Sequence, residues 1–304
     1  MRPSVAKRGR PRKHAGDAPS PEQLRRLKFI ERAARWTGRV GRRAVAATFD
    51  LSMSHVSLDL QRYRTMAPNN LAYDVVEKCF RPTERFRPIF DDGDAAKLLS
   101  TIAATAWLPE QERGRLLGFA IPTDAVQPLP MMADQELLAM LCRSITAGSA
   151  LEIGYQSLNT PEPVSRTFAP QALIFTGQRW LVRGWDGRHK GFRDLALARM
   201  VAAGESSTLP DIPRDDLWHD RVTLTLVPVD GLSTSQVEVT AREYGMTSDN
   251  EEGYRVKIAA RQALVPYLLD YLRLRPGDFA AGPVRLLHFE AIERFDRERK
   301  RPTS

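Results

Sequence analysis

The alternation of apolar and polar positions predicts helices in the first part of the chain. From Pro21 to Trp36, apolar residues recur at steps of three and four, which is the period of an amphipathic helix. Ser20 is placed to cap this helix, the proline after it suits the first helical position, and Gly38 marks its end. A second short helix is predicted from Arg42 to Phe49, and a third begins after Ser52, which can serve as its N-cap.

The second and third of these helices have the spacing of a helix-turn-helix, whose second helix enters the major groove of DNA. Apolar residues would hold the pair at a fixed angle, and these are Ala46, Phe49, Leu51, Val56 and Leu60. The short polar side chains of Ser54, His55 and Ser57 are expected to face bases. The basic side chains of Arg62, Arg64 and Lys78 are expected to face phosphates. The complete predicted DNA-binding set is Ser52, Ser54, His55, Ser57, Gln61, Arg62, Arg64 and Lys78.

Two strands of a wing are predicted after the third helix. Asn69-Asn70 turns the chain into a strand at 71–73, and a second strand follows within 75–80, which would bring Lys78 close to the DNA backbone. The alternative is a helical bundle whose basic residues are only solvated. Residues 91–132 predict two further helices and a proline-containing connection, so we expect a helical linker there.

The period changes from helix to strand in the second half of the chain. An amphipathic helix is predicted from Ala133 to Ala147, and five short strands follow, separated by Gly, Pro and Asn turns. These strands are expected at 150–157, 164–169, 172–176, 179–185 and 191–197. Such a pattern is typical of a small, strongly bent sheet or partial barrel. The hairpin from Gln178 to Met200 carries five arginines and would present a cationic surface to an anionic ligand, unless these arginines are only solvated.

The last part of the chain predicts further strands and one apolar helix. Strands are expected at 222–227, 236–240 and 254–258, and the helix at 262–272.

The distribution of charge indicates the kind of partner that the N-terminal part binds. Residues 1–90 hold 20 Lys and Arg against 8 Asp and Glu, whereas the rest of the chain holds 25 against 29. A polyanion is therefore the natural partner of the N-terminal part. Residues 1–20 have almost nothing to bury, so a disordered basic tail is expected. Within it, Lys7 to Lys13 resembles an AT-hook core, which lies in the minor groove of DNA, although it could equally be a phosphate-binding or solubilising tail.

Residue types that carry catalysis or bind metals are scattered along the chain. The five histidines lie far apart, Cys79 and Cys142 have no CxxC spacing, and no HExxH, GxSxG or GxxxxGK[ST] motif occurs. We therefore expect no catalytic residues, no metal and no cofactor, with a nucleic-acid-processing enzyme as the alternative. No apolar run approaches the roughly 20 residues of a membrane span, so we expect no membrane partner and a cytoplasmic location.

Four segments in the second half of the chain carry a resemblance to a known family. They read LEIGYQS, SRTFAPQAL, RWLVRGWD and FRDLALARM, and together they look like the WYL domain of bacterial transcription regulators, an Sm-like β-barrel. Arg179-Trp180-Leu181 takes the place of the Trp-Tyr-Leu tripeptide that names the domain, and Gln171 stands where the family commonly has histidine. The resemblance runs from residue 21 to about 298, and it is strongest to the group that regulates phage-defence islands of the BREX and CBASS type.

This resemblance implies an α+β fold in three parts: an N-terminal winged helix-turn-helix, a central WYL Sm-like β-barrel and a C-terminal α/β dimerisation domain. The expected boundaries are 1–20 for the tail, 21–90 for the winged helix, 91–132 for the linker, 133–205 for the WYL domain and 215–298 for the dimerisation domain. The ligand face that the resemblance implies consists of Tyr155, Ser157, Arg166, Arg183, Arg193 and Arg199. Arginines there would bind the phosphates of a nucleotide or short nucleic-acid ligand.

The implied function is a homodimeric, sequence-specific repressor of a phage-defence operon. It would bind an inverted-repeat operator in double-stranded DNA and be released by the ligand of the WYL domain. A ligand-dependent activator with the same architecture is one alternative, and a sensor that binds nucleic acid without controlling a promoter is another. Arg193 and Arg199 could instead pair with Asp194, Glu152 or the linker and only hold the sheet.

Overall fold

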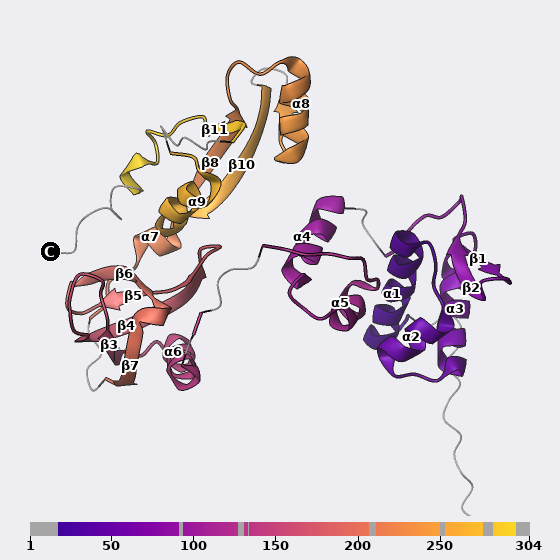
Figure 1. The fold of residues 1–304 in the computed structure, drawn as a ribbon, viewed down its shortest axis with the longest axis horizontal. Coiled ribbons are helices and arrows are strands. Elements are labelled where there is room, and N and C mark those ends of the chain that lie inside the picture. The colour runs from indigo at the N-terminus through magenta and orange to yellow at the C-terminus, as the bar shows by residue number, and fades with distance from the viewer. Residues whose placement is uncertain are drawn as a thin grey trace, which may run out of the picture. The chain divides into compact units, whose positions relative to one another are not determined.

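The chain divides into two units, residues 1–127 and residues 128–304 (Figure 1). The computed structural model describes residues 18–90, 94–126, 131–132, 134–206, 211–249, 253–275 and 282–295. The AT-hook-like segment from Lys7 to Lys13 lies outside the described residues, as does most of the expected tail.

The first unit begins with the three predicted helices. They are α1 (Pro21–Thr37), α2 (Arg42–Phe49) and α3 (Met53–Met66). Ser20 caps α1 by accepting a hydrogen bond from the N–H of Gln23 at 3.2 Å, and Ser52 caps α3 by accepting one from the N–H of His55 at 3.3 Å. Gly38 ends α1 in the left-handed conformation. The helix starts and the helix end predicted from these residues are confirmed.

A two-stranded wing follows α3, as predicted. β1 (Leu71–Asp74) and β2 (Cys79–Pro82) pair antiparallel, and the connection between α1 and α2 adds a bridge from Val40 to Phe80. The Val40 N–H donates to the Phe80 carbonyl at 2.8 Å and the Phe80 N–H donates back at 2.9 Å. The wing is therefore fixed to the segment that leads into α2, and its strands share one core with α1, α2 and α3.

Two helices of the predicted linker, α4 (Ala95–Thr105) and α5 (Glu110–Leu117), fold onto the same unit. Ile102, Leu117 and Phe119 form a small buried cluster against Trp36 of α1. Arg113 of α5 is buried and donates hydrogen bonds to the carbonyls at 106 and 123. These helices are thus part of the folded unit rather than a simple spacer.

The second unit contains a five-stranded antiparallel sheet, covered on one side by α6 (Gln135–Ala147). Its strands are β3 (Leu151–Tyr155), β4 (Val164–Phe175), β5 (Trp180–Asp186), β6 (Gly191–Ala196) and β7 (Met200–Glu205), in the order β6-β5-β4-β3-β7. Among the described residues the edge strands β6 and β7 do not pair, so the sheet does not close into the expected Sm-like barrel. β7 was not predicted, because the run MVAAGE lacks a strong strand pattern.

The segments predicted as two strands at 164–169 and 172–176 form one strand, β4, with a bulge between Pro170 and Ala172. Gly184 of β5 lies opposite this bulge. A Cβ atom there would lie 2.4 Å from the carbonyl oxygen of Ala169, so only glycine allows the two strands to approach this closely. The bulge and the glycine together bend the sheet.

A four-stranded antiparallel sheet completes the second unit. Its elements are α7 (Asp216–His219), β8 (Arg221–Pro228), α8 (Thr234–Glu243), β9 (Thr247–Asp249), β10 (Gly253–Arg261), α9 (Val265–Leu272) and β11 (Val284–Leu286), with the strands in the order β11-β8-β10-β9. The strand predicted at 236–240 is wrong, because these residues lie in α8. Ser233 and Gln236 form a capping box, which starts a helix and overrides the strand preference of the two valines that follow.

Candidate nucleic-acid interface and ligand cavity

The exposed side of α3 carries the side chains predicted to face bases. Ser54 and His55 are exposed, whereas Ser57 is half-buried and its hydroxyl donates to the carbonyl of Met53 at 2.8 Å. Ser52 uses its hydroxyl to cap the helix. Of the three side chains predicted to face bases, Ser54 and His55 are therefore the two that are fully exposed.

The remaining predicted DNA-contacting residues lie further along α3 and on the wing. Gln61 and Arg64 are exposed and Arg62 is half-buried. The guanidinium of Arg64 lies 5.7 Å from the ring centre of Phe80, so it spans from the helix to the wing. Lys78 is exposed at the end of the wing turn, in the left-handed conformation with φ 52°.

One carboxylate shapes the turn of the wing. Asp74 accepts hydrogen bonds from the N–H groups of Val76 at 2.9 Å and Glu77 at 3.0 Å, and from the guanidinium of Arg81 at 2.9 Å. These contacts hold the pKa of Asp74 below its usual value, with the N–H of Glu77 contributing most. The same side chain explains why the second strand of the wing begins only at Cys79, because it holds the backbone before that residue in a turn.

Two buried carboxylates fix the position of α3 against the rest of its unit. Asp59 of α3 accepts from Arg26 at 2.6 Å and from Gln23 at 3.0 Å, both on α1. Glu31 of α1 accepts from the hydroxyl of Tyr63 of α3 at 2.9 Å. Burial raises the pKa of that hydroxyl well above its usual value, so Tyr63 remains a hydrogen-bond donor.

A cavity of about 630 Å³ lies in the second unit, between the five-stranded sheet and residues that lead into α9. All six residues of the predicted ligand face line it, namely Tyr155, Ser157, Arg166, Arg183, Arg193 and Arg199. The opposite wall comes from the C-terminal part of the unit, with Leu217, Gln262, Ala263, Pro266, Tyr267 and Phe295. The fold therefore brings the predicted residues together. A molecule in the cavity would contact both the five-stranded sheet and the C-terminal part of the unit.

Arg183 is already paired with carboxylates. Its guanidinium donates two hydrogen bonds to Asp215, at 2.6 and 2.9 Å, and one to Asp194 at 2.9 Å. Burial disfavours the charged form of Arg183, but hydrogen bonding and attraction to the two aspartates outweigh it and raise its pKa. Arg183 thus holds the wall of the cavity together, a structural role that the sequence had suggested only for Arg193 and Arg199.

Arg166 is also paired, and it lies over the ring of Tyr155, another residue of the predicted ligand face. Its guanidinium donates to Asp186 at 2.9 Å and lies 5.1 Å from the ring centre of Tyr155. The hydroxyl of Tyr155 accepts from the N–H of Ala196 at 3.2 Å. The pKa of Asp186 lies below its usual range, because contacts with His189 and Arg166 outweigh the effect of burial.

Arg193 and Arg199 differ from the other two arginines of the predicted face. Both are half-buried in the cavity wall, and no carboxylate in the described ranges pairs with either. Arg188, which is not among the predicted ligand-face residues, is exposed and lines the same cavity. These three guanidinium groups are the ones available to an anionic ligand.

Phe192 and Tyr267 are aromatic residues of the cavity that were not predicted from the sequence. Phe192 is half-buried, lines the cavity and packs edge-on against Trp185 at 5.2 Å between ring centres. Tyr267 lines it from the other wall and donates to Asp194 at 2.8 Å. Alternation in the predicted hairpin places Phe192 on the opposite face of its strand from Arg193, so it gave no signal for Phe192 in the cavity. No local signal places Tyr267 there.

Within the described parts of the chain, no group of three or more His, Cys, Asp or Glu side chains is arranged to hold a metal ion. Over the same residues, none of the helices combines the length and the apolar character needed to cross a membrane.

Three family models match successive parts of the chain. Residues 22–104 match the winged helix-turn-helix domain of BrxR transcriptional regulators, residues 136–204 match the WYL domain, and residues 221–291 match the C-terminal dimerization domain of BrxR transcriptional regulators. The resemblance found in the sequence is thereby confirmed.

Curated relatives extend the match over most of the chain. The DNA-binding transcriptional repressor CapW of Escherichia coli (strain KTE188) is 32% identical over 265 residues, which is 87% of each chain. Proteins of the same name from Pseudomonas aeruginosa and Stenotrophomonas maltophilia are 32% and 33% identical over 255 and 254 residues, in each case 83% of both chains. The relatives' names describe transcriptional repressors and not enzymes. The chain therefore belongs to the family of CapW repressors, with the winged helix, WYL and C-terminal domains of the BrxR-type regulators.

Proposed function

We propose that this chain is a DNA-binding transcriptional repressor that acts as a homodimer at a phage-defence operon. The observation that carries this proposal is the 32% identity over 265 residues to the CapW repressor. The match of residues 221–291 to a dimerization domain supports the homodimer, and the exposed polar start of α3 supports contact with double-stranded DNA. A two-fold dimer predicts an inverted-repeat operator with half-sites about one helical turn, or a multiple of it, apart.

Selection of bound duplexes from a random pool tests this proposal directly. Successive rounds should enrich one inverted repeat. Recovery of duplexes without any shared sequence would instead favour a protein that binds nucleic acid without controlling a promoter.

A nucleotide or a short single-stranded nucleic acid in the cavity of the second unit is the ligand that would release this repressor. Arg188, Arg193 and Arg199 supply guanidinium groups for phosphates, and Phe192 supplies a ring for a base. The Nε of Arg166 is buried without a hydrogen-bond partner in the described structure, which leaves a donor for such a ligand. Because the cavity wall includes residues of the dimerisation domain, occupation of the cavity would be coupled to the arrangement of the dimer.

Substitution of Arg193 tests the ligand proposal. Arg193→Ala should weaken binding of short single-stranded oligodeoxynucleotides about 10- to 100-fold, because a hydrogen bond to a charged group contributes roughly 1.5–3 kcal/mol. Operator affinity without oligonucleotide should stay the same. Isothermal titration calorimetry with a series of oligodeoxynucleotides measures the oligonucleotide affinity. Fluorescence anisotropy with labelled operator DNA measures the operator affinity. Arg179→Ala, an exposed arginine of the same hairpin outside the cavity, is the control, and equal oligonucleotide affinities in the two variants would contradict the assignment.

Two substitutions on α3 separate base contacts from phosphate contacts. His55→Ala should reduce the preference for the operator over a scrambled duplex by about 1–3 kcal/mol, since its side chain is expected to reach a base edge. Arg64→Ala should weaken binding to both duplexes alike and flatten the slope of log affinity against log salt by about 0.9. Titration of both variants with both duplexes over a range of salt decides this. Equal losses on the two duplexes for His55→Ala would argue against base contact.

A further inference from the structure

A histidine lines the cavity of the second unit and pairs with a buried carboxylate. His189 lies in the turn between β5 and β6, and its side chain is 20% exposed. Its ring Nδ1 lies 2.8 Å from Oδ2 of Asp186, whose side chain has no exposed surface. The predicted ligand face did not include this histidine.

Asp186 determines which nitrogen of the ring carries a proton. Its Oδ1 accepts from the N–H of Arg188 at 3.0 Å, and its Oδ2 accepts from Arg166 at 2.9 Å in addition to its contact with His189. Burial raises the pKa of Asp186, but the hydrogen bonds from His189 and Arg166 outweigh it, so the carboxylate stays ionised at neutral pH. An ionised carboxylate only accepts hydrogen bonds, so Nδ1 of His189 is the donor of this pair.

The other ring nitrogen of His189 is left for a molecule in the cavity. In the described part of the chain, Nε2 has no hydrogen-bond partner. In the neutral ring this nitrogen is an acceptor and repels a phosphate oxygen, whereas in the protonated ring it is a charged donor that attracts one. The charge of the ring therefore decides whether His189 favours or opposes a phosphate.

Cations around His189 oppose its protonation as long as no anion is bound. Lys190 follows it in the turn, and guanidinium groups line the cavity from each element of the sheet side, namely Arg166 of β4, Arg183 of β5, Arg188 of the turn, Arg193 of β6 and Arg199 before β7. Among the described lining residues the one carboxylate is Asp194, which is already bonded to Arg183 and Tyr267. The lining residues of the C-terminal part include no charged side chain. A phosphate would offset the cations, so its binding favours the protonated ring.

We propose that His189 is a further ligand-binding residue, whose protonated ring donates from Nε2 to a phosphate of the ligand, so that the ligand binds together with a proton. The inference rests on the ligand of the proposed function, and it adds a regulator of that site. The protonated form is the one that binds, so affinity for the ligand is highest at low pH and falls as pH rises through the range in which histidine loses its charge.

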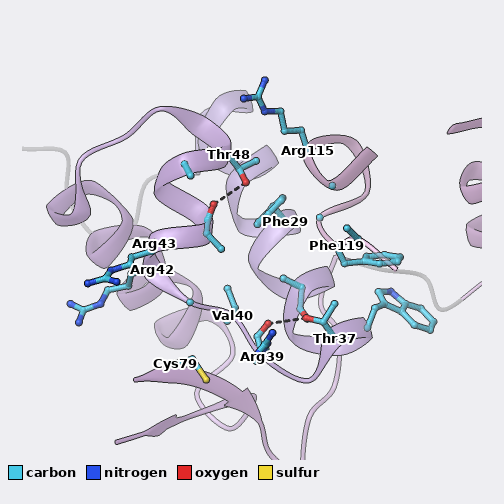
Figure 2. A pocket seen from close by; sticks show the side chains of 18 of the residues that line it. Phe29, Thr37, Arg39, Val40, Arg42, Arg43, Thr48, Cys79, Arg115 and Phe119 are labelled. Carbon is cyan, nitrogen blue, oxygen red and sulfur yellow. Dashed lines mark hydrogen bonds between the residues drawn. The ribbon is translucent and has the colours of Figure 1, made fainter. Parts of the chain in front are cut away.

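A second hollow, in the first unit, provides a contrast. Figure 2 shows Arg42 and Arg43 beside one another at its edge, and no histidine is among the described residues that line it. An oligonucleotide bound there would not follow the charge of a histidine side chain. Dependence of affinity on pH therefore distinguishes binding in the cavity of the second unit.

Titration calorimetry of the full-length protein with a short oligothymidylate tests the proposal. This probe carries no terminal phosphate, so its own charge is constant between about pH 6 and about pH 8, where histidine changes its charge. The affinity of the wild-type protein should fall about tenfold over this range, because a hydrogen bond from a charged donor contributes about that factor. Repetition near neutral pH in two buffers of different ionisation enthalpy should show that the protein takes up part of a proton on binding.

Three variants assign this effect to His189. His189→Gln keeps a donor for Asp186 but carries no charge, so it should bind about tenfold more weakly than wild type at the lower pH, with no dependence on pH and no proton uptake. His189→Lys is charged at both pH values and should bind equally well at both. His219→Gln, at an exposed histidine outside the cavity, should keep the wild-type behaviour.

Two results would overturn the inference, and they differ in what they say of the proposed function. If the wild-type protein binds the oligothymidylate equally at both pH values, or if His189→Gln keeps the wild-type dependence on pH, His189 only shapes the turn and the proposed ligand stands. If the wild-type protein binds no oligothymidylate at either pH, the proposed ligand fails and the role of His189 fails with it.

Discussion

Replacing Arg183 by methionine is expected to lower the free energy of unfolding of the second unit by about 3–5 kcal/mol at neutral pH. The guanidinium is 4% exposed and links β5 to Asp194 of β6 and to Asp215 at the start of α7. Methionine fills a similar volume but leaves both carboxylates without their positive partner. Asp194 also accepts from Tyr267, so the loss should extend to the N-terminal end of α9.

Amide hydrogen exchange of the full-length protein measures this loss of stability separately for each helix and strand. Strand β5 and helix α9 should lose protection in Arg183→Met, whereas α1 and α3 should keep theirs, because they belong to the other unit. Adding Asp215→Asn should restore part of the loss, since it removes one unpaired carboxylate. Arg188→Met, an exposed arginine on the same cavity, should change stability by no more than about 0.5 kcal/mol. A loss in Arg183→Met no larger than that control would contradict the structural role of Arg183.

One of the two carboxylate partners of Arg183 could be predicted from the sequence, and the other could not. The hairpin of β5 and β6 was predicted, and its register pairs Arg183 directly with Asp194 across the two strands. The partner that accepts two of the three hydrogen bonds, Asp215, lies 32 residues further along the chain. Nothing in a local pattern places it there, because its position depends on how the two sheets of the unit pack.

Residue type alone also could not separate the four arginines of the predicted ligand face. Their alternation with apolar residues is similar, yet Arg166 and Arg183 are buried and paired while Arg193 and Arg199 are half-buried and unpaired in the described structure. Arg166 and Arg183 lie on the inner strands β4 and β5, whereas Arg193 lies on the edge strand β6 and Arg199 lies in the short 3-10 helix before β7, so their place in the folded sheet distinguishes them. That place is a long-range property which periodicity does not report.

Helix boundaries were more predictable, because capping depends on neighbouring residues. Ser20 and Ser52 were identified as caps from the sequence, and each accepts the expected hydrogen bond. The error at 236–240 arose from the alternating valines, although Ser233 and Gln236 had the spacing of a capping box. Where a strand pattern and a capping signal compete over so few residues, the capping signal is the better guide in this chain.

Replacing Glu31 by alanine is expected to destabilise the first unit by about 3–5 kcal/mol, since each buried donor left without an acceptor costs roughly 1–3 kcal/mol. Glu31 is fully buried, and its carboxylate accepts from the hydroxyl of Tyr63 at 2.9 Å and from the N–H groups of Ile89 and Phe90 at 2.8 Å each. Asn70 continues the network by donating to the Tyr63 hydroxyl at 3.0 Å. These bonds join α1, α3 and the segment after the wing.

Operator binding should therefore fall together with stability in Glu31→Ala, although Glu31 touches no DNA, because α3 and the wing lose their fixed spacing. Denaturant unfolding and anisotropy on the same samples measure the two quantities. Tyr63→Phe removes one donor to Glu31 and one acceptor of Asn70 but leaves the other two donors of Glu31 in place, so it should cost less, about 1–2 kcal/mol. Glu22→Ala, at an exposed position in the first turn of the same helix, should cost at most about 1 kcal/mol through its interaction with the helix dipole. If Glu31→Ala were as stable as Glu22→Ala, the buried carboxylate would not be what positions the recognition helix.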